Sequence, residues 1–157
     1  MTVEPDAALR DTPGDAPAAG NQEGARAIPE AVIREKIARD PFCRREGFVL
    51  EELRPGYARV SVTLTEDMLN FHGSAHGGLI FALADAAFAA ASNSRGVPAV
   101  ALTATIHYLR PAAAGTTLVA TATEENLTRK TALYRVVVAP PEGPPVATFS
   151  GLVYRKR

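Results

Sequence analysis

Asp85 is the first residue that suggests chemistry, because it is the only charged side chain between His76 and Arg95. It lies in an alanine-rich stretch, residues 79–91, that is otherwise apolar on every side of a helix. A helix that is hydrophobic all round is normally buried, and an ionised carboxyl is costly to bury. Burial raises the pKa of an acid unless donors hold its charge, and perturbed acids concentrate at active sites. The pattern alone allows both a structural and a catalytic role for Asp85.

A second element lies at the expected start of this helix, where His76 is followed by Gly77 and Gly78. Glycine lets a ligand approach the backbone closely, and the first N–H groups of a helix have no acceptors within it. Together with the helix dipole, these N–H groups can stabilise an oxyanion or a polarised carbonyl. An ordinary helix entry can carry the same three residues, so the motif is weak by itself.

The two elements cannot serve one substrate atom from the same helix. At about 1.5 Å of rise per residue, Asp85 lies about 12 Å beyond Gly77 along the helix axis. If both act on a single carbonyl carbon, one of them must come from another copy of the helix that runs antiparallel. The hypothesis therefore requires a symmetric dimer with the active site at its interface.

The elements that must position these residues indicate an α+β fold. Apolar residues at helical spacing predict a short N-terminal helix from Pro29 to the break at Asp40-Pro41. Two strands are expected before the central helix and four after it, separated by turn signals. Their expected ranges are 47–53, 57–65, 98–109, 116–125, 131–139 and 146–155. We therefore expect an antiparallel sheet of about six strands wrapped around one alanine-rich helix.

The composition narrows the class of protein. The 157 residues include 17 basic and 17 acidic ones, so the net positive charge on which nucleic-acid binding depends is missing. The single cysteine, Cys43, can form no internal disulfide and provides no zinc-finger spacing. This usage fits a reducing cytosol. No metal or cofactor is expected. We expect no secretory signal and no membrane span. Residues 1–28 are expected to be a disordered tail before one domain over residues 29–157.

Several ordered blocks resemble the hot-dog-fold thioesterases, most closely the branch found in bacterial phenylacetate degradation. The resemblance covers roughly residues 35–155 and rests on Asp67-Met68-Leu69-Asn70, His76-Gly77-Gly78, residues 81–85 and 91–96, and Tyr108-Leu109-Arg110-Pro111-Ala112. It implies a cytoplasmic enzyme that hydrolyses acyl-CoA thioesters, with phenylacetyl-CoA or its hydroxylated forms as expected substrates. It also implies homodimers whose sheets join edge to edge, commonly paired again into a homotetramer.

The resemblance also implies roles for single residues. Asp85 corresponds to the family's helical acid, which either activates a water as general base or attacks the carbonyl as nucleophile. Gly77 corresponds to the glycine whose N–H polarises the thioester carbonyl, and His76 would steady the same oxygen or fix the loop. Asn70 corresponds to an amide that helps place water or substrate. Thr103 corresponds to a hydroxyl that helps hold the lytic water, an assignment that depends on strand register.

Coenzyme A carries phosphates, which require cationic contacts. Arg110, before a proline in one of the family-like blocks, and Arg129-Lys130, at an expected hairpin, are the candidates. Ordinary solvated surface charge explains each of them at least as well. His72 and His107 have no comparable support and are left out of the site.

Two other functions share parts of this pattern. A hot-dog enoyl-CoA hydratase or dehydratase would have the same fold, but such enzymes pair a catalytic histidine with an acid to move protons at carbon. A non-catalytic acyl-CoA-binding regulator is the second alternative, although such regulators usually carry an added DNA-binding module. Hydration of enoyl-CoA would favour the first, and tight acyl-CoA binding without thiol release would favour the second.

Overall fold

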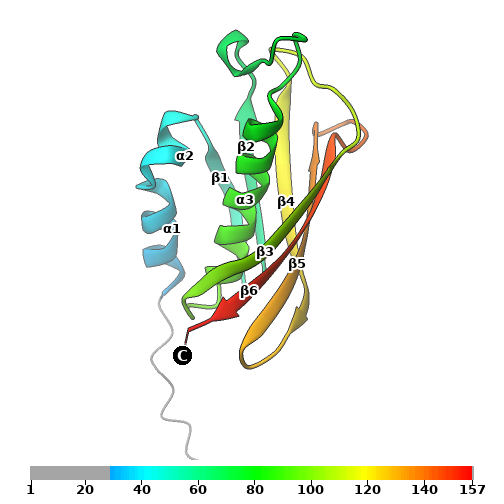
Figure 1. Cartoon of the computed structure of the whole chain (residues 1–157). Coiled ribbons are helices and arrows are strands. Elements are labelled where there is room, and N and C mark those ends of the chain that lie inside the picture. The colour runs from blue at the N-terminus through cyan, green and yellow to red at the C-terminus, as the bar shows by residue number, and fades with distance from the viewer. Residues whose placement is uncertain (1–28, 157) are drawn as a thin grey trace, which may run out of the picture.

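A computed structural model describes residues 29–156, and the tail expected over residues 1–28 lies outside them. The strands are β1 (Val49–Arg54), β2 (Tyr57–Thr63), β3 (Ala99–Tyr108), β4 (Thr117–Leu127), β5 (Thr131–Ala139) and β6 (Ala147–Arg155). They form one antiparallel sheet in the order β1-β2-β4-β5-β6-β3. The sheet curls around the long helix α3 (Gly77–Asn93), as Figure 1 shows. The predicted α+β arrangement, six strands around one alanine-rich helix, is confirmed.

The helix α3 joins the two sides of the sheet, since it follows β2 near one edge and leads to β3 at the other. Within the described chain, β3 has a single hydrogen-bonded neighbour, β6. The apolar side chains of Val100 and Leu102 lie exposed on β3. This strand therefore presents an open, partly apolar edge.

The core lies between α3 and the concave face of the sheet. Every second residue along β2 and just beyond it is buried, as predicted: Ala58, Val60, Val62 and Leu64. Across from them, the alanines of α3 allow close approach of the sheet. The ring of Phe88 lies directly on Gly151 of β6, where a Cβ would stand 2.6 Å from its Cζ atom. Gly151 is therefore required by the close approach of this ring.

The N-terminal region differs from the prediction in one respect. The expected helix, α1 (Glu30–Ala38), ends before Pro41, but the chain then forms a second helix, α2 (Pro41–Arg45). Asp40 caps it by accepting a hydrogen bond from the Cys43 N–H at 2.9 Å, and Pro41 occupies the first turn. The same Asp-Pro pair thus ends one helix and starts the next. The pair α1–α2 lies beside β1 and α3 (Figure 1).

The expectation that α3 is buried on every side is wrong for a single protomer. Phe81, Ala82, Asp85 and Ala86 are half-buried and Ala89 is exposed. These residues face the α1–α2 pair across a cavity instead of packing on the sheet. An apolar pattern does not distinguish a side that packs on a sheet from a side that lines a cavity. No helix among the described residues is long and apolar enough to cross a membrane.

Candidate active site

The carboxyl group of Asp85 faces a cavity of about 430 Å³ between α3 and the α1–α2 pair. The other lining residues are Ile37, Asp40, Phe42, Cys43, Phe81, Ala82, Ala86 and Ala89. Burial raises the pKa of Asp85, and no donor or cation of the described chain counteracts this effect. A half-buried acid with a raised pKa and no partner among the described residues is suited to take up a proton during a reaction.

The thiol of Cys43 is the other reactive group in this cavity. Burial and the neighbouring Asp40 carboxylate raise the pKa of Cys43 to about 11, with a smaller contribution from Asp85. Since only the thiolate is a good nucleophile, Cys43 is inert near neutral pH. Asp40 is already engaged in capping α2. Asp85 is therefore the group of this cavity that is suited to act as base or nucleophile.

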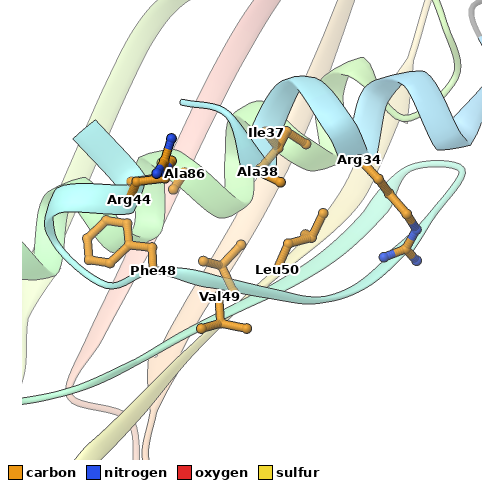
Figure 2. A pocket seen from close by; sticks show the side chains of 10 residues that line it. Arg34, Ile37, Ala38, Arg44, Phe48, Val49, Leu50 and Ala86 are labelled. Atoms are coloured by element: carbon orange, nitrogen blue, oxygen red, sulfur yellow. The ribbon is translucent and has the colours of Figure 1, made fainter. Parts of the chain in front are cut away.

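A second cavity of about 310 Å³ lies on the other side of Ala86, between the α1–α2 pair and β1. Figure 2 shows apolar side chains such as Ile37, Phe48 and Leu50 around it. At its rim, Arg34 pairs with Glu30 at 2.9 Å. Its described lining also includes Cys43, Arg34 and Arg44, but no carboxylate. It adds largely apolar volume beside the Asp85 cavity, without a group suited to act as base near neutral pH.

The start of α3 is organised by His76, which caps the helix. Its Nδ1 accepts a hydrogen bond from the Gly78 N–H at 3.0 Å, so the neutral imidazole carries its proton on Nε2. The Gly77 N–H has no acceptor among the described residues. The imidazole of His76 therefore caps α3, and its predicted role at the thioester oxygen or in fixing the loop stays a prediction. The helix start thus offers two donors that no described residue engages, the Gly77 N–H and the His76 Nε2–H.

Sequence reasoning missed a contact at this helix start. The hydroxyl of Tyr108, at the end of β3, donates a hydrogen bond to the Gly77 carbonyl oxygen at 2.9 Å. Tyr108 belongs to a block that resembles the family, but the sequence carries no signal that links it to Gly77. The link arises because the end of β3 and the start of α3 meet in the fold.

Asn70 organises the loop that leads to α3. Its Oδ1 accepts hydrogen bonds from the backbone N–H groups of His72 at 2.8 Å and Ser74 at 3.4 Å. The loop closes onto itself where the His76 N–H donates to the Met68 carbonyl at 2.9 Å. Asn70 therefore shapes the turn over residues 70–74 that precedes the helix start.

Other predicted residues are not brought together within one chain. Gly77 and Asp85 lie on the uninterrupted helix α3, about 12 Å apart along its axis. Thr103 pairs with Leu152, while the adjacent Gly151 faces Phe88 and the core. Because paired residues share a face of the sheet, Thr103 lies on the side turned away from α3. A register shift in β3 just before Thr103 is a local irregularity that residue counting does not predict.

The candidate phosphate-binding cations lie at two ends of the sheet. Arg110 follows β3, and its guanidinium donates to the Pro145 carbonyl at 2.8 Å. Arg129 and Lys130 lie in the β4–β5 turn, where the Lys130 carbonyl accepts from the N–H of Arg155 at 2.8 Å, beside the start of β3. One chain therefore does not gather all three into a single cationic cluster.

Comparison with known proteins places this architecture in a family. The sequence profile of the thioesterase superfamily matches residues 72–147. Acyl-coenzyme A thioesterase PaaI of Escherichia coli (strain K12) is 41% identical over 116 residues, covering 74% of this chain and 83% of that protein. The structure of the E. coli PaaI protein from the phenylacetic acid degradation operon matches with a TM-score of 0.76 at 36% identity, covering 82% of this chain and 97% of that one.

Two further solved structures agree. The TT0310 protein from Thermus thermophilus is 52% identical with a TM-score of 0.72, covering 75% of this chain and 99% of that one. The protein smu.793 from Streptococcus mutans UA159, bound to acetyl CoA, is 29% identical with a TM-score of 0.66, covering 69% and 88%. The predicted hot-dog fold and the resemblance to the phenylacetate-degradation branch are thereby confirmed. This chain belongs to the thioesterase superfamily and is a hot-dog-fold acyl-CoA thioesterase.

Proposed function

We propose that this enzyme hydrolyses aryl-acetyl-CoA thioesters, such as phenylacetyl-CoA and its hydroxylated forms, to the free acid and CoA. The observation that carries the proposal is the Asp85 carboxyl, which has no partner among residues 29–156 and faces a largely apolar cavity of about 430 Å³. Pockets for small ligands commonly measure about 300–1,000 Å³. Phe42 and Phe81 provide ring contacts for an aryl group. The origin of E. coli PaaI in a phenylacetic acid degradation operon supports the choice of acyl group.

The proposed site is completed by two protomers, because Asp85 and Gly77 of one helix lie too far apart to touch one carbonyl group. The Gly77 N–H of one protomer donates to the thioester oxygen. Asp85 of the other protomer either takes a proton from the attacking water or attacks the carbonyl carbon itself, giving a mixed anhydride that water then cleaves. In both routes the C–S bond breaks and CoA leaves as a thiolate that takes up a proton. Detection of acyl-modified Asp85 by mass spectrometry after a rapid quench would indicate the nucleophilic route. Absence of this adduct during turnover would indicate the general-base route.

The remaining residues complete this proposal. Asn70 and His76 belong to the Gly77 half of the site, where the amide places water or substrate and the His76 Nε2–H is a second donor to the thioester oxygen. Thr103 is assigned to the lytic water only across the dimer interface, since it faces away from α3 in its own chain.

The open edge of β3 supports a homodimer in which the two β3 strands pair antiparallel, since exposed strand edges are normally covered. Such pairing brings the end of one β3 strand to the start of the other. It therefore brings Arg110 of one protomer toward Arg129 and Lys130 of its partner, where the CoA phosphates would bind. We propose that two dimers associate into a homotetramer and that the enzyme works in the cytosol. Light scattering tests the proposed homotetramer by measuring the mass of the assembly in solution.

A panel of acyl-CoA substrates with free-thiol detection tests the proposed function. We expect phenylacetyl-CoA and its hydroxylated forms to give higher kcat/KM values than acetyl-CoA and medium-chain acyl-CoAs. Higher values for the aliphatic thioesters would contradict the proposed acyl group. Enoyl-CoA hydration, followed separately by absorbance, tests the hydratase alternative. Tight binding of every substrate without thiol release would indicate a regulator.

A further inference from the structure

Tyr108 contacts the start of α3 with both its hydroxyl and its ring. The hydroxyl donates to the Gly77 carbonyl oxygen at 2.9 Å. The ring lies against Gly77, where an added Cβ would stand 3.4 Å from the Cζ atom of Tyr108. An added Cβ would make only ordinary contact with the ring, so the ring covers the start of α3 closely without excluding a small side chain there.

The Tyr108 hydroxyl is the first member of a chain of hydrogen bonds through the peptide group between Gly77 and Gly78. On the carbonyl side, Tyr108 donates to the oxygen of Gly77; on the amide side, the Gly78 N–H donates to His76 Nδ1 at 3.0 Å. Hydrogen bonds linked through one peptide group polarise and strengthen each other. The chain of bonds fixes the orientation of this peptide group and keeps the imidazole proton of His76 on Nε2.

Tyr108 is itself held by the sheet. It pairs with Ala147 at the end of the β3–β6 ladder, and the following Leu109 N–H donates to the Val146 carbonyl at 2.8 Å. The hydroxyl thus ties the first turn of α3 to a rigid part of the fold. Without this tie, the glycine-rich helix start would depend on the His76 cap and the preceding loop alone.

We propose that Tyr108 is a positioning residue that holds the first turn of α3, and with it the Gly77 N–H of the preceding peptide group and the His76 Nε2–H, in line with the thioester oxygen. This inference rests on the proposed role of Gly77. Donors of this kind act by pre-orientation toward the charge that develops in the transition state. Loss of the Tyr108 hydroxyl should therefore lower kcat and leave substrate binding nearly unchanged.

Tyr108→Phe in the full-length enzyme tests the proposal, because it removes the hydroxyl and keeps the ring on Gly77. We expect kcat to fall about tenfold with KM within about twofold of the parent, as for loss of one orienting hydrogen bond. The matched control is Tyr154→Phe, since Tyr154 is a half-exposed tyrosine of β6 whose hydroxyl has no hydrogen-bond partner among the described residues. The control should keep the parental kcat and KM.

The ¹⁵N chemical shifts of the His76 imidazole provide a second readout that needs no turnover. In Tyr108→Phe they should move toward a mixture of the two neutral tautomers, whereas in Tyr154→Phe they should not move. This readout keeps the inference testable even if another acid replaces Asp85 in the reaction. Parental kcat together with unmoved His76 signals in Tyr108→Phe would overturn the proposal. A rise in KM with unmoved His76 signals would also overturn it, because Tyr108 would then act as a substrate contact.

Discussion

Gly77 and Asp85 lie on one uninterrupted helix, separated by about 12 Å along its axis, and their functional groups have no partners among the described residues of their own chain. The Gly77 N–H lies free at the helix start, and the Asp85 carboxyl faces an apolar cavity. A thioester carbonyl cannot reach both groups of one helix. This separation makes the dimeric site testable by substitutions at each residue.

Gly77→Pro should remove the proposed oxyanion donor and keep the helix. Proline has no N–H and is favoured at the first position of a helix, and His76 already has the extended conformation that a residue before proline adopts, with ψ 132°. We expect kcat to fall by about 10²–10³-fold, as for loss of one oxyanion-hole donor. Gly77→Ala is the control because it keeps the N–H and brings a Cβ only into ordinary contact with Tyr108. Equal kcat losses in the two variants would contradict the role of the N–H.

Asp85→Asn should abolish most of the thioester hydrolysis and leave the fold intact. An amide neither accepts the proton of the attacking water nor forms the anhydride, so we expect kcat to fall by at least about 10²-fold. Asp40→Asn is the matched control, since Asp40 lines the same cavity and asparagine caps α2 about as well as aspartate. Free-thiol release from phenylacetyl-CoA measures both variants. Parental rates in Asp85→Asn would show that this carboxyl is neither the general base nor the nucleophile.

Mixing the two inactive variants should restore activity. In a hybrid dimer of Gly77→Pro and Asp85→Asn chains, one site carries both substitutions and the other carries neither. Random exchange of subunits should therefore recover about a quarter of the parental rate, since half of the dimers are hybrids with one intact site. Refolding the chains together and separately, followed by thiol detection, provides the comparison. Absence of recovery in mixtures shown to contain hybrids would place the whole site within one chain.

The elements of this fold could be predicted from the sequence because their signals are local. Alternation in β2 identified its buried face, and the apolar stretch after Gly78 identified α3. The helix α2 was missed because the Asp40-Pro41 pair signals both an end and a start. The half-exposed stripe of α3 was missed because alanine and phenylalanine look alike on core-facing and cavity-facing sides of a helix.

The site was predictable only in part. Asp85 was recognisable as an isolated charge and Gly77 by its place at a helix start. The cavity wall formed by Phe42 and Cys43 depends on how α1–α2 lies beside α3, which no local pattern encodes. The contact of Tyr108 with Gly77 likewise depends on tertiary structure. Residues that act through long-range contacts thus need the fold, whereas isolated charges are visible in the sequence.

Asp85 should also make the stability of the enzyme depend on pH. Burial raises its pKa in the folded state, so between the unfolded and folded pKa values the folded protein binds more protons than the unfolded one. The stability that the protonated Asp85 carboxyl contributes to the folded state is therefore fully present below its unfolded pKa, about 3.9. It is lost as pH rises through the raised folded pKa. Asp85→Asn should unfold at higher urea concentration than the parent near neutral pH, whereas Asp40→Asn, which changes an exposed carboxyl, should not. An Asp85→Asn variant that is less stable at neutral pH would contradict the burial cost.

Phe42 should limit the size of the acyl group. Its ring lines both the Asp85 cavity and a neighbouring groove of about 390 Å³ that includes His76 and Gly78. Phe42→Ala should connect these spaces and remove a ring contact for an aryl group, shifting the kcat/KM ratio of octanoyl-CoA to phenylacetyl-CoA upward by about tenfold. The control is Phe48→Leu, because Phe48 packs edge-on against Phe42 at 6.2 Å between ring centroids but lines the cavity without a carboxylate. An unchanged ratio in Phe42→Ala, measured by thiol release, would show that the acyl group binds elsewhere.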